Sequence, residues 1–413
     1  MEFIYQYAFR SSEKNNMKNF IFISPNFPSN YWQFCDRLAK NGINVLGIGD
    51  CPYDELEPGL KGALKEYYKV SNLENYDEVY RAVAFLIFLY GRIDWIESYN
   101  EYWLERDAQL RTEFNINTGF KSEDMPKIKY KSKMKEYYQK AGIPVARYHI
   151  VDDREGCLSF IRQVGYPVIV KPDNGVGANH TCRIASEADL DAFFGEMLPV
   201  TYIMEECVNG QICSYDAIID SQGNPVFESG NVTCSSIMDI VNDGMDSFYY
   251  IVKELADDVR EAGRKTVKSF GVSSRFVHLE FFRLLADQES LGKKGDIVAL
   301  EVNMRPSGGY TPEMLNYANG TDVYKIWADM IAYDSTQFPQ MGHYYCAFAG
   351  RRNSSSYVLD DNTLIGKYAM EVCQCSKIPD ALSGAMGNRM ILAKFDSYDH
   401  MQEFFADAAR KNR

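Results

Sequence analysis

Short apolar runs alternate with amphipathic stretches over the first part of the chain. Residues 18–24, KNFIFIS, and 43–49, INVLGIG, are apolar, and the stretch YWQFCDRLAKNG between them has helical periodicity. The alternation continues with a helical stretch, NYDEVYRAVAFLIFLYG, and another apolar run, RIDWIES. Because strand, helix, strand is typical of a parallel α/β sheet, we predict an α/β domain that closes near residue 120.

After residue 120, the pattern predicts strands joined by polar crossings. The lysine-rich stretch PKIKYKSKMKEYYQKAG is predicted to be one helix, ended by glycine and proline. DAIID followed by PVFES predicts a hairpin. YYIVKELADDVREAGRKTVKSFG and NYANGTDVYKIWADMIA are each predicted to be one helix.

Length and charge limit the classes of protein that fit this pattern. A chain of 413 residues predicts two or three domains, and 46% hydrophobic residues are ordinary for a globular protein. A net charge of −13 argues against a basic surface that binds nucleic acid. The apolar run AVAFLIFLYG is too short to cross a bilayer, so we expect no membrane partner.

The cysteines and the first residues suggest a reducing compartment. Ten cysteines are scattered along the chain without a CxxC pair, which predicts reduced thiols in a cytoplasm. Residues 1–16 lack the pattern of a signal peptide and are expected to be an extension before the first strand. The sequence contains no Gly-x-Gly-x-x-Gly, so a dinucleotide cofactor is not indicated.

The stretch DIVALEVNMRPSGGYTPEM is the strongest candidate for chemistry. Side chains alternate along a strand, so Glu301 and Asn303 point to the same face and offer the oxygen ligands that Mg²⁺ prefers. Arg305 follows as a fixed cation for phosphate oxygens. Upstream, RFVHLEFFRLL carries Glu280, and a hairpin would bring the two glutamates together. For each of these residues taken alone, a solvated strand end is the simpler interpretation.

Two weaker signals suggest contacts with a nucleotide. The strand YPVIVKP ends at Lys171, and Gly175 and Gly177 follow in a loop whose N–H groups could curl round phosphate oxygens. A plain turn is the alternative interpretation of this loop. The crossing 205–208 could offer backbone groups to an adenine edge, or it could simply connect two subdomains.

Taken in order, these pieces resemble the ATP-grasp superfamily over residues 17 to about 335. KSKMKEYYQKAGIP, YPVIVKPDNGVGA, MEECV and the pair LEFF and LEVNMR resemble its phosphate helix, second lysine strand, adenine hinge and magnesium strands. The resemblance implies an α/β (α+β) chain with the ATP-grasp fold and an N-terminal parallel α/β pre-ATP domain. The implied division is an extension at 1–16, the pre-ATP domain at 17–120, the ATP-grasp domain at 121–335 with a lid subdomain at about 145–207, and a C-terminal α+β portion at 336–413.

The resemblance also implies the residues of the site. It assigns the first phosphate lysine to Lys131, with Lys133 as the alternative. The implied ATP contacts are Lys131, Lys171, Gly175, Gly177, Glu205, Glu206, Cys207 and Val208, and the implied ligands for Mg²⁺, or Mn²⁺ in its place, are Glu280, Glu301 and Asn303. Gln211 and Ile212 depart from the family at its usual ribose-binding glutamate, so either Asp216 takes that contact or the contact is weaker.

Within the superfamily, NEYWLERDAQLR, EVNMRPSGGYTPEM and NYANGTDVYKIWADM resemble carboxylate–amine ligases, which include amino-acid ligases. The resemblance implies a cytoplasmic enzyme that forms an amide or peptide bond through an acyl phosphate and releases ADP and phosphate, with Arg305 and Lys171 as catalytic residues. Its partners would be a small carboxylate and an amine, and a homodimer is consistent with similar proteins. Biotin carboxylase and carbamoyl-phosphate synthase are related alternatives. An ATP-binding protein without ligase turnover is the alternative from another class.

Two features remain open in the sequence. His278 shares the strand face of Glu280, and we prefer a packed core histidine to a catalytic base. Glu101 and Arg106 lie on the helix predicted after the third strand, and the sequence does not show whether they reach a substrate.

Overall fold

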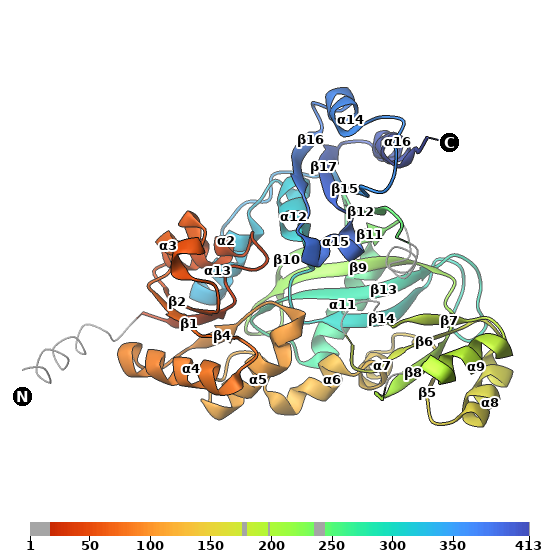
Figure 1. Cartoon of the computed structure of the whole chain (residues 1–413), viewed down its shortest axis with the longest axis horizontal. Helices are drawn as coiled ribbons and strands as arrows, with labels where there is room; N and C mark the ends of the chain where they lie inside the picture. Colours follow the sequence, from red (N-terminus) through yellow and green to blue (C-terminus); the bar gives the residue numbers. More distant parts are fainter. Residues whose placement is uncertain (1–16, 176–179, 197–198, 235–243, 413) are drawn as a thin grey trace, which may run out of the picture. The chain divides into compact units, whose positions relative to one another are not determined.

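The computed structural model describes residues 17–175, 180–196, 199–234 and 244–412, and the chain forms two compact units (Figure 1). Unit 1 is Met1–Glu123 with Tyr324–Thr336, and unit 2 is Asp124–Val323 with Gln337–Arg413. Residues 324–335, which the sequence analysis assigned to the ATP-grasp domain, lie in unit 1. The expected extension at 1–16 lies outside the described residues.

Unit 1 is built on the parallel sheet that the sequence predicts. Four strands lie in the order β3-β2-β1-β4, and every pair is parallel. The strands are β1 (Asn19–Ile23), β2 (Asn44–Gly49), β3 (Glu66–Lys69) and β4 (Trp95–Glu97). The helices are α2 (Trp32–Lys40), α3 (Pro58–Ala63), α4 (Tyr76–Tyr90), α5 (Leu104–Glu113) and α13 (Val323–Tyr333), with short 3-10 turns at Tyr53–Glu55, Glu101–Trp103 and Ser122–Asp124.

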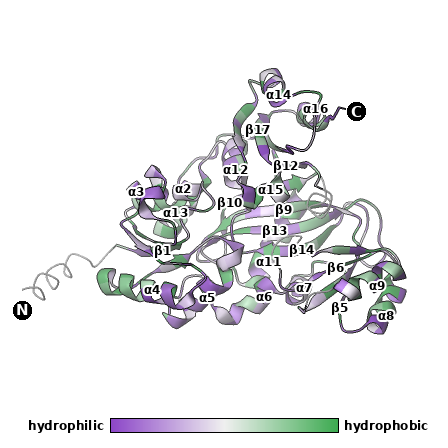
Figure 2. Cartoon of the chain, in the orientation of Figure 1, coloured by the Kyte–Doolittle hydropathy of each residue, from purple (hydrophilic) through white to green (hydrophobic). Residues whose placement is uncertain are grey.

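The aliphatic core of unit 1 includes Ile21, Leu46 and Val83, and Figure 2 shows α4 as largely hydrophobic. α13 contributes Trp327, whose ring contacts Phe20 and Phe34 edge-on. The sequence predicts one helix over NYANGTDVYKIWADMIA, and this prediction is wrong. The helix stops at Gly320, whose φ of +55° is left-handed, and a new helix begins at Val323.

The larger sheet of unit 2 has nine strands and carries the candidate site. Its order is β14-β13-β9-β11-β12-β15-β17-β16, with β10 paired to β9, and all neighbours are antiparallel. The strands are β9 (Gly210–Ile219), β10 (Pro225–Ser229), β11 (Asn231–Thr233), β12 (Ser247–Ile251), β13 (Arg275–Leu284), β14 (Ile297–Asn303), β15 (Tyr345–Arg351), β16 (Val372–Lys377) and β17 (Arg389–Phe395). The predicted hairpin of DAIID and PVFES is confirmed as β9 and β10.

A smaller antiparallel sheet of unit 2 has the order β5-β8-β6-β7. Its strands are β5 (Tyr148–Ile150), β6 (Val168–Pro172), β7 (Cys182–Ile184) and β8 (Tyr202–Glu206). Two helices, α8 (Arg154–Val164) and α9 (Glu187–Glu196), pack against it. Their shared core contains Cys157 and Phe160 from α8, Phe193 from α9, and Val170 and Met204 from the strands.

The remaining helices of unit 2 are α6 (Met125–Lys129), α7 (Lys131–Lys140), α11 (Asp257–Phe270), α12 (Thr311–Asn319), α14 (Asp361–Lys367), α15 (Asp380–Met386) and α16 (Tyr398–Ala409). Two predicted helices are corrected here. The lysine-rich helix is broken at Tyr130, whose backbone is extended. The start of YYIVKELADDVREAGRKTVKSFG belongs to strand β12, because its aromatic and β-branched residues pair with β15.

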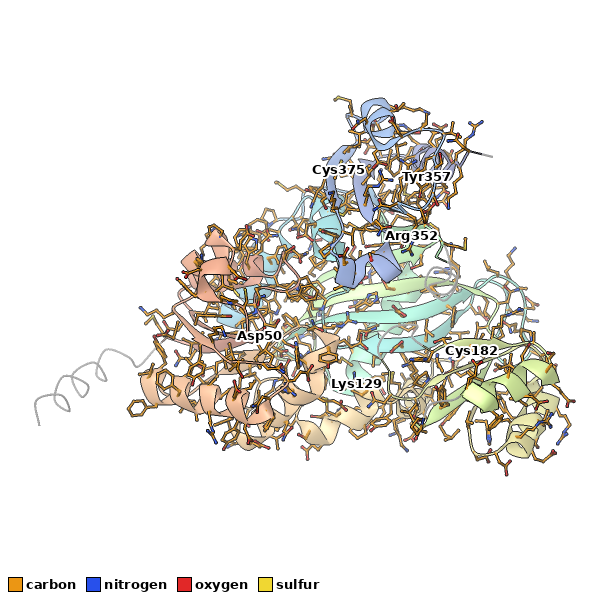
Figure 3. The ribbon with its side chains drawn as sticks, viewed as in Figure 1. Asp50, Lys129, Cys182, Arg352, Tyr357 and Cys375 are labelled. Atoms are coloured by element: carbon orange, nitrogen blue, oxygen red, sulfur yellow. The ribbon has the colours of Figure 1, made fainter. Side chains whose placement is uncertain are left out.

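Polar contacts of the residues that follow β15 in the sequence connect the C-terminal segments. Arg352 donates to the backbone oxygens of Met245, Ser383 and Gly384, and the Tyr357 hydroxyl donates to Asp246 (Figure 3). Within the described ranges, no helix combines the length and apolar character needed to cross a bilayer.

Candidate active site

A grid of polar side chains lies on one face of three neighbouring strands of the large sheet. β13 lies between β9 and β14, and directly opposed residues in antiparallel strands share a face. Two adjacent rows cross the three strands, namely Asp216, His278 and Asn303, and Ser214, Glu280 and Glu301. The expected hairpin is therefore confirmed, because Glu280 and Glu301 are direct cross-strand partners.

Exposure rises across this grid from β9 to β14. Asp216 is fully buried, whereas the side chain of Glu280 is 16% exposed and that of Glu301 is 21% exposed. His278 links the two ends: Nδ1 lies 2.8 Å from Asp216 Oδ1, and Nε2 lies 2.9 Å from Glu280 Oε1. A hydrogen-bonded chain thus runs from the buried interior to an acid that a ligand can reach.

The charge state of His278 follows from its two neighbours. Burial alone would lower the pKa of His278, but the carboxylates of Asp216 and Glu280 outweigh it and raise this pKa to about 10. At neutral pH the ring is therefore an imidazolium with both nitrogens donating. A ring that already holds both protons cannot act as a general base, which agrees with the preference stated from the sequence.

The donors on β13 and β14 fit a hard divalent cation. Glu280, Glu301 and Asn303 place two carboxylates and an amide oxygen on the same face, at the accessible end of the grid. Nearby, the buried Tyr138 hydroxyl has no hydrogen-bond partner in the described part of the chain. Burial raises the pKa of Tyr138 well above its ordinary value, and Glu301 and Glu280 add to the shift, so the hydroxyl lies within the field of both acids.

A second charged cluster joins α7 to the small sheet. Lys171 Nζ lies 2.8 Å from one oxygen of Glu205, and Lys135 Nζ lies 2.9 Å from the other. Ile169 of β6 opposes Glu205 of β8, so Lys171, two residues along β6, projects from the same face. All three side chains are largely buried.

The three charges of this cluster stabilise one another. Burial would raise the pKa of Glu205, but Lys135 and Lys171 overcome that effect and lower the pKa to about 2. The two lysines differ. Burial dominates at Lys135 and lowers its pKa, whereas at Lys171 the attraction of Glu205, with Glu301 and Glu280 behind it, outweighs burial and raises the pKa.

The start of α7 is fixed by a residue that sequence reasoning missed. Asp173, just after β6, accepts hydrogen bonds from the backbone N–H and the hydroxyl of Ser132, both at 2.7 Å, and its carbonyl accepts from Lys131 N–H. A carboxylate at a helix N-terminus satisfies free N–H groups and complements the helix dipole. This cap directs Lys131, whose Nζ lies 3.2 Å from Gly175 O and 3.5 Å from Glu301.

The predicted adenine hinge, residues 205–208, comprises the last two residues of β8 and the two that follow. The side chain of Glu206 forms an ion pair with Arg147 at 2.7 Å and accepts a hydrogen bond from Ser290, and its backbone N–H donates to the Arg147 carbonyl. The Cys207 carbonyl accepts from Gln288. The nucleotide contacts of this segment stay a prediction.

Several predicted residues are placed by the structure as follows. Arg305 donates to Asn303 Oδ1 at 3.2 Å and to the Pro306 carbonyl, so it lies beside the proposed metal ligands. Asp216 is held by Ser214 and His278 and is fully buried. The ribose contact of Asp216 stays a prediction, and the burial of its carboxylate favours the alternative, in which the ribose contact is weaker.

The remaining predicted residues are as follows. Gly177 lies outside the described residues. Lys133, the alternative phosphate lysine, is exposed and pairs with Glu136. Glu101 and Arg106 are in unit 1, where Arg106 donates to the Glu74 carbonyl.

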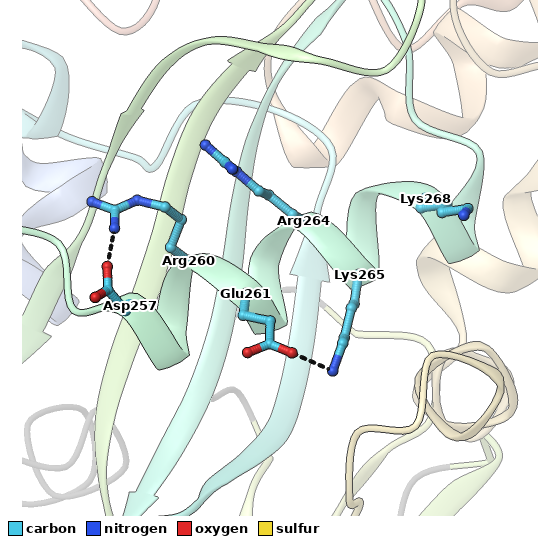
Figure 4. Close-up of a pocket in the computed structure, with 6 residues that line it drawn as sticks. All are labelled: Asp257, Arg260, Glu261, Arg264, Lys265 and Lys268. Atoms are coloured by element: carbon cyan, nitrogen blue, oxygen red, sulfur yellow. Dashed lines mark hydrogen bonds and ion pairs between the residues drawn. The ribbon is translucent and has the colours of Figure 1, made fainter.

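A surface hollow of about 390 Å³ on α11 is a poorer candidate (Figure 4). It is lined by Asp257, Arg260, Glu261, Arg264, Lys265 and Lys268. Three of its cations are already engaged: Arg260 with Asp257, Lys265 with Glu261, and Arg264 with Glu228. Such paired, exposed charges stabilise a helix surface and do not by themselves define a binding site.

Lys135 was missed, although one signal for it was present. It lies four residues after Lys131 on a helix, and residues at that spacing share a face. Ser214 and Asp173 gave no such signal, because their roles depend on strands and helices that the chain brings together only on folding.

Comparisons with known proteins agree with this geometry. No family model matches the sequence. The carbamoyl phosphate synthase large chain of Thermotoga petrophila is 27% identical over 223 residues, which are 51% of this chain and 19% of that protein. This chain thus spans about a fifth of the length of that curated relative.

Solved structures match almost the whole chain. The L-amino acid ligase from Bacillus licheniformis superposes with a TM-score of 0.70 at 16% identity, covering 95% of this chain and 96% of that one. The biotin carboxylase domain of Hydrogenobacter thermophilus 2-oxoglutarate carboxylase, solved with MgADP, ADP and bicarbonate, gives a TM-score of 0.65 at 14% identity, with coverage of 94% and 90%. This chain therefore has the ATP-grasp fold.

Proposed function

We propose that this chain is an ATP-dependent carboxylate–amine ligase that forms an amide or peptide bond and releases ADP and phosphate. The observation that carries the proposal is the polar grid, in which two acids, an amide oxygen and Arg305 meet on one sheet face beside Lys131. The match to an amino acid ligase over nearly the full chain supports it. Small carboxylate and amine substrates are its proposed partners, and a homodimer in the cytoplasm is the proposed setting.

The electrostatic difficulty of this reaction is that a carboxylate must approach the anionic γ-phosphate of ATP. Glu280, Glu301 and Asn303 are the residues that would hold Mg²⁺, with Mn²⁺ as a substitute. When bound, such an ion screens the repulsion and stabilises the transferring phosphoryl group.

The cations of the chain have separate tasks in this proposal. Lys131 and Lys171 hold phosphate oxygens, and Lys171 retains N–H donors beyond its contact with Glu205 in the described part of the chain. Arg305 orients the substrate carboxylate and stabilises the acyl phosphate through paired N–H donors. The amine then attacks the acyl carbon, phosphate leaves and the amide forms.

Glu205 also has a role in this scheme. Its backbone, with Glu206, Cys207 and Val208, is proposed to contact adenine. Its side chain, held between Lys135 and Lys171, fixes the direction of the phosphate-binding ammonium group. Biotin-carboxylase-like or carbamoyl-phosphate-synthase-like chemistry is the alternative within the fold, and nucleotide binding without turnover is the alternative outside it.

The decisive experiment follows one oxygen atom. A screen of ATP hydrolysis against amino acids, singly and in pairs, first identifies a substrate. With that carboxylate labelled by oxygen-18, the acyl-phosphate route sends one labelled oxygen into inorganic phosphate and yields ADP, because the carboxylate attacks the γ-phosphorus. Label in AMP would contradict the proposal, and so would phosphate that carries only solvent oxygen while an amide forms.

A further inference from the structure

A second, chemically different cluster lies on the small sheet of unit 2. His149 on β5, Asp152 in the following loop and Cys157 in the first turns of α8 place an imidazole nitrogen, a carboxylate oxygen and a thiol within 4.8 Å of one another. All three lie within nine residues of sequence. None of them contacts the polar grid or the lysine–glutamate cluster through any hydrogen bond or ion pair described above.

We propose that His149, Asp152 and Cys157 form a binding site for a Zn²⁺-class transition-metal ion. A thiolate, an imidazole and a carboxylate are the ligand set that Zn²⁺ and Co²⁺ prefer, whereas Mg²⁺ selects oxygen ligands alone. Three protein ligands leave a fourth tetrahedral position for water or another small donor. This inference does not depend on the proposed ligase activity.

The separation of the imidazole and the carboxylate is close to the one that such an ion requires. His149 Nε2 and Asp152 Oδ1 are 2.8 Å apart, as a hydrogen-bonded pair. Zn²⁺ with ligands at about 2.0–2.3 Å separates tetrahedral donors by roughly 3.4–3.7 Å, so this pair would widen by less than about 1 Å. Side chains that are 26% and 60% exposed can make that movement and leave an entry path.

The backbone is shaped to hold the carboxylate close to the thiol. A Cβ at Gly156 would lie 2.3 Å from Asp152 Oδ1, so a glycine at this position lets the carboxylate rest against the first turn of α8. Asp153 N–H donates to the same Asp152 oxygen at 2.7 Å. The His149 ring is stacked on Phe160 with a 5.9 Å centroid separation, which limits its rotation.

Ligation requires the thiolate form of Cys157, so the thiol proton should be released when an ion binds. The ion would take the place of the hydrogen bond between His149 and Asp152. It would connect His149 on β5 to Cys157 on α8.

Co²⁺ is the probe for this site, because sulfur-to-cobalt charge transfer in the near ultraviolet reports thiolate ligation directly. The metal-stripped full chain is titrated with Co²⁺ without nucleotide, and Zn²⁺ is added in competition. We expect one equivalent of thiolate-bound Co²⁺, displaced by Zn²⁺ with release of about one proton. Absence of the charge-transfer band would overturn the proposal.

Matched variants locate the ion. Cys157→Ala should abolish the band, whereas Cys182→Ala, the same change on β7 of the same sheet (Figure 3), should leave it intact. Asp152→Asn and His149→Gln should weaken binding at least as much as the roughly 10–100-fold known for loss of an outer-shell partner. Because Asp152 and His149 are partly exposed, these two variants keep the test decisive even if Cys157→Ala does not fold.

Gly156→Ala gives the sharpest test, because it removes no ligand and only displaces the Asp152 carboxylate. We expect weaker Co²⁺ binding with an unchanged far-ultraviolet circular dichroism spectrum. Wild-type affinity in both Gly156→Ala and Asp152→Asn would overturn the three-ligand site. Glu301→Gln should bind Co²⁺ here as the wild type does, so a failure of the ligase proposal and a failure of this one are distinguishable.

Discussion

Both units bury charged side chains, but they satisfy these charges in different ways. In unit 1, Arg111 is 1% exposed and forms an ion pair with Glu97 at 2.9 Å. The same guanidinium also donates to the Ile96 carbonyl and to the Phe120 carbonyl. Asp107 beside it accepts from the N–H and the hydroxyl of Ser98. Most of the bonds of this cluster end on the backbone of unit 1, while the buried Asp107 Oδ1 has no hydrogen-bond partner in the described part of the chain.

In the candidate site of unit 2, the charged side chains bind one another in two series, of which one reaches the partly exposed Glu280 and the other stays largely buried. Asp216 binds His278, and His278 binds Glu280, which is partly exposed. Lys135 binds Glu205, and Glu205 binds Lys171, whose pKa also responds to Glu301 and Glu280. The comparison teaches that burial of charge does not by itself mark a functional site. Charges that are bonded mainly to the backbone are expected to stabilise the fold, whereas charged side chains that bind one another next to an accessible acid are the ones that we propose to orient ligands.

The largest expected loss of activity comes from a change at Glu301, the most exposed acid of the polar grid in unit 2. Glu301→Gln keeps the shape of the side chain and removes one charge from the proposed metal site. We expect ATP turnover to fall by at least about 100-fold, because several kcal/mol of charge stabilisation are lost, with little change in unfolding free energy. Steady-state ADP formation and urea unfolding measure the two effects.

The control for Glu301→Gln is the same change at Glu289, an exposed residue in the connection of the same hairpin. It should leave turnover within a factor of two or so, as most exposed substitutions do. Near-normal turnover of Glu301→Gln would show that this acid is as dispensable for activity as a surface charge. The proposed difference between a structural cluster in unit 1 and a catalytic one in unit 2 would then be wrong.

A smaller effect is expected at His278, which lies between the buried Asp216 and the accessible Glu280. His278→Gln keeps an amide NH2 group as a donor, but it lacks the positive charge and the two separate donor nitrogens with which the imidazolium bridges Asp216 and Glu280. We expect Mg²⁺ affinity to fall by about 10–100-fold, the usual cost of losing a residue that orients a metal ligand. The measurement is the Mg²⁺ dependence of ATP turnover. A loss that saturating Mg²⁺ does not rescue would show that His278 acts on the reaction itself and not by positioning Glu280.

The sequence predicts the parts of this arrangement that depend on local pattern. The parallel sheet of unit 1 and the pairing of Glu280 with Glu301 follow from strand periodicity and from a short polar connection. The role of Asp216 did not follow, because its contact with His278 joins residues 62 positions apart through strand register. The N-terminal cap of α7 by Asp173 likewise joins a helix to a later strand, and no local pattern encodes it.

The smallest effect is expected in unit 1 and depends on pH. Burial raises the pKa of Asp107 to about 7, and nearby Glu97 adds to the shift, while Arg111 and Ser98 oppose it. An acid whose folded pKa lies above its unfolded value near 4 binds more protons when folded, so its contribution to stability falls as pH rises from about 4 to about 7. Asp107→Asn removes this dependence and keeps an acceptor for Ser98.

Relative to the wild type, Asp107→Asn should therefore gain roughly 2 kcal/mol of unfolding free energy between pH 5 and pH 8, because each pKa unit corresponds to about 1.4 kcal/mol. Urea unfolding at the two pH values measures this difference. ATP turnover of the folded variant should match the wild type at both pH values, since the cluster in unit 1 is bonded mainly to the backbone of that unit. A variant with lost turnover and unchanged stability would place Asp107 with the functional charges of unit 2 and would contradict the distinction drawn between the two clusters.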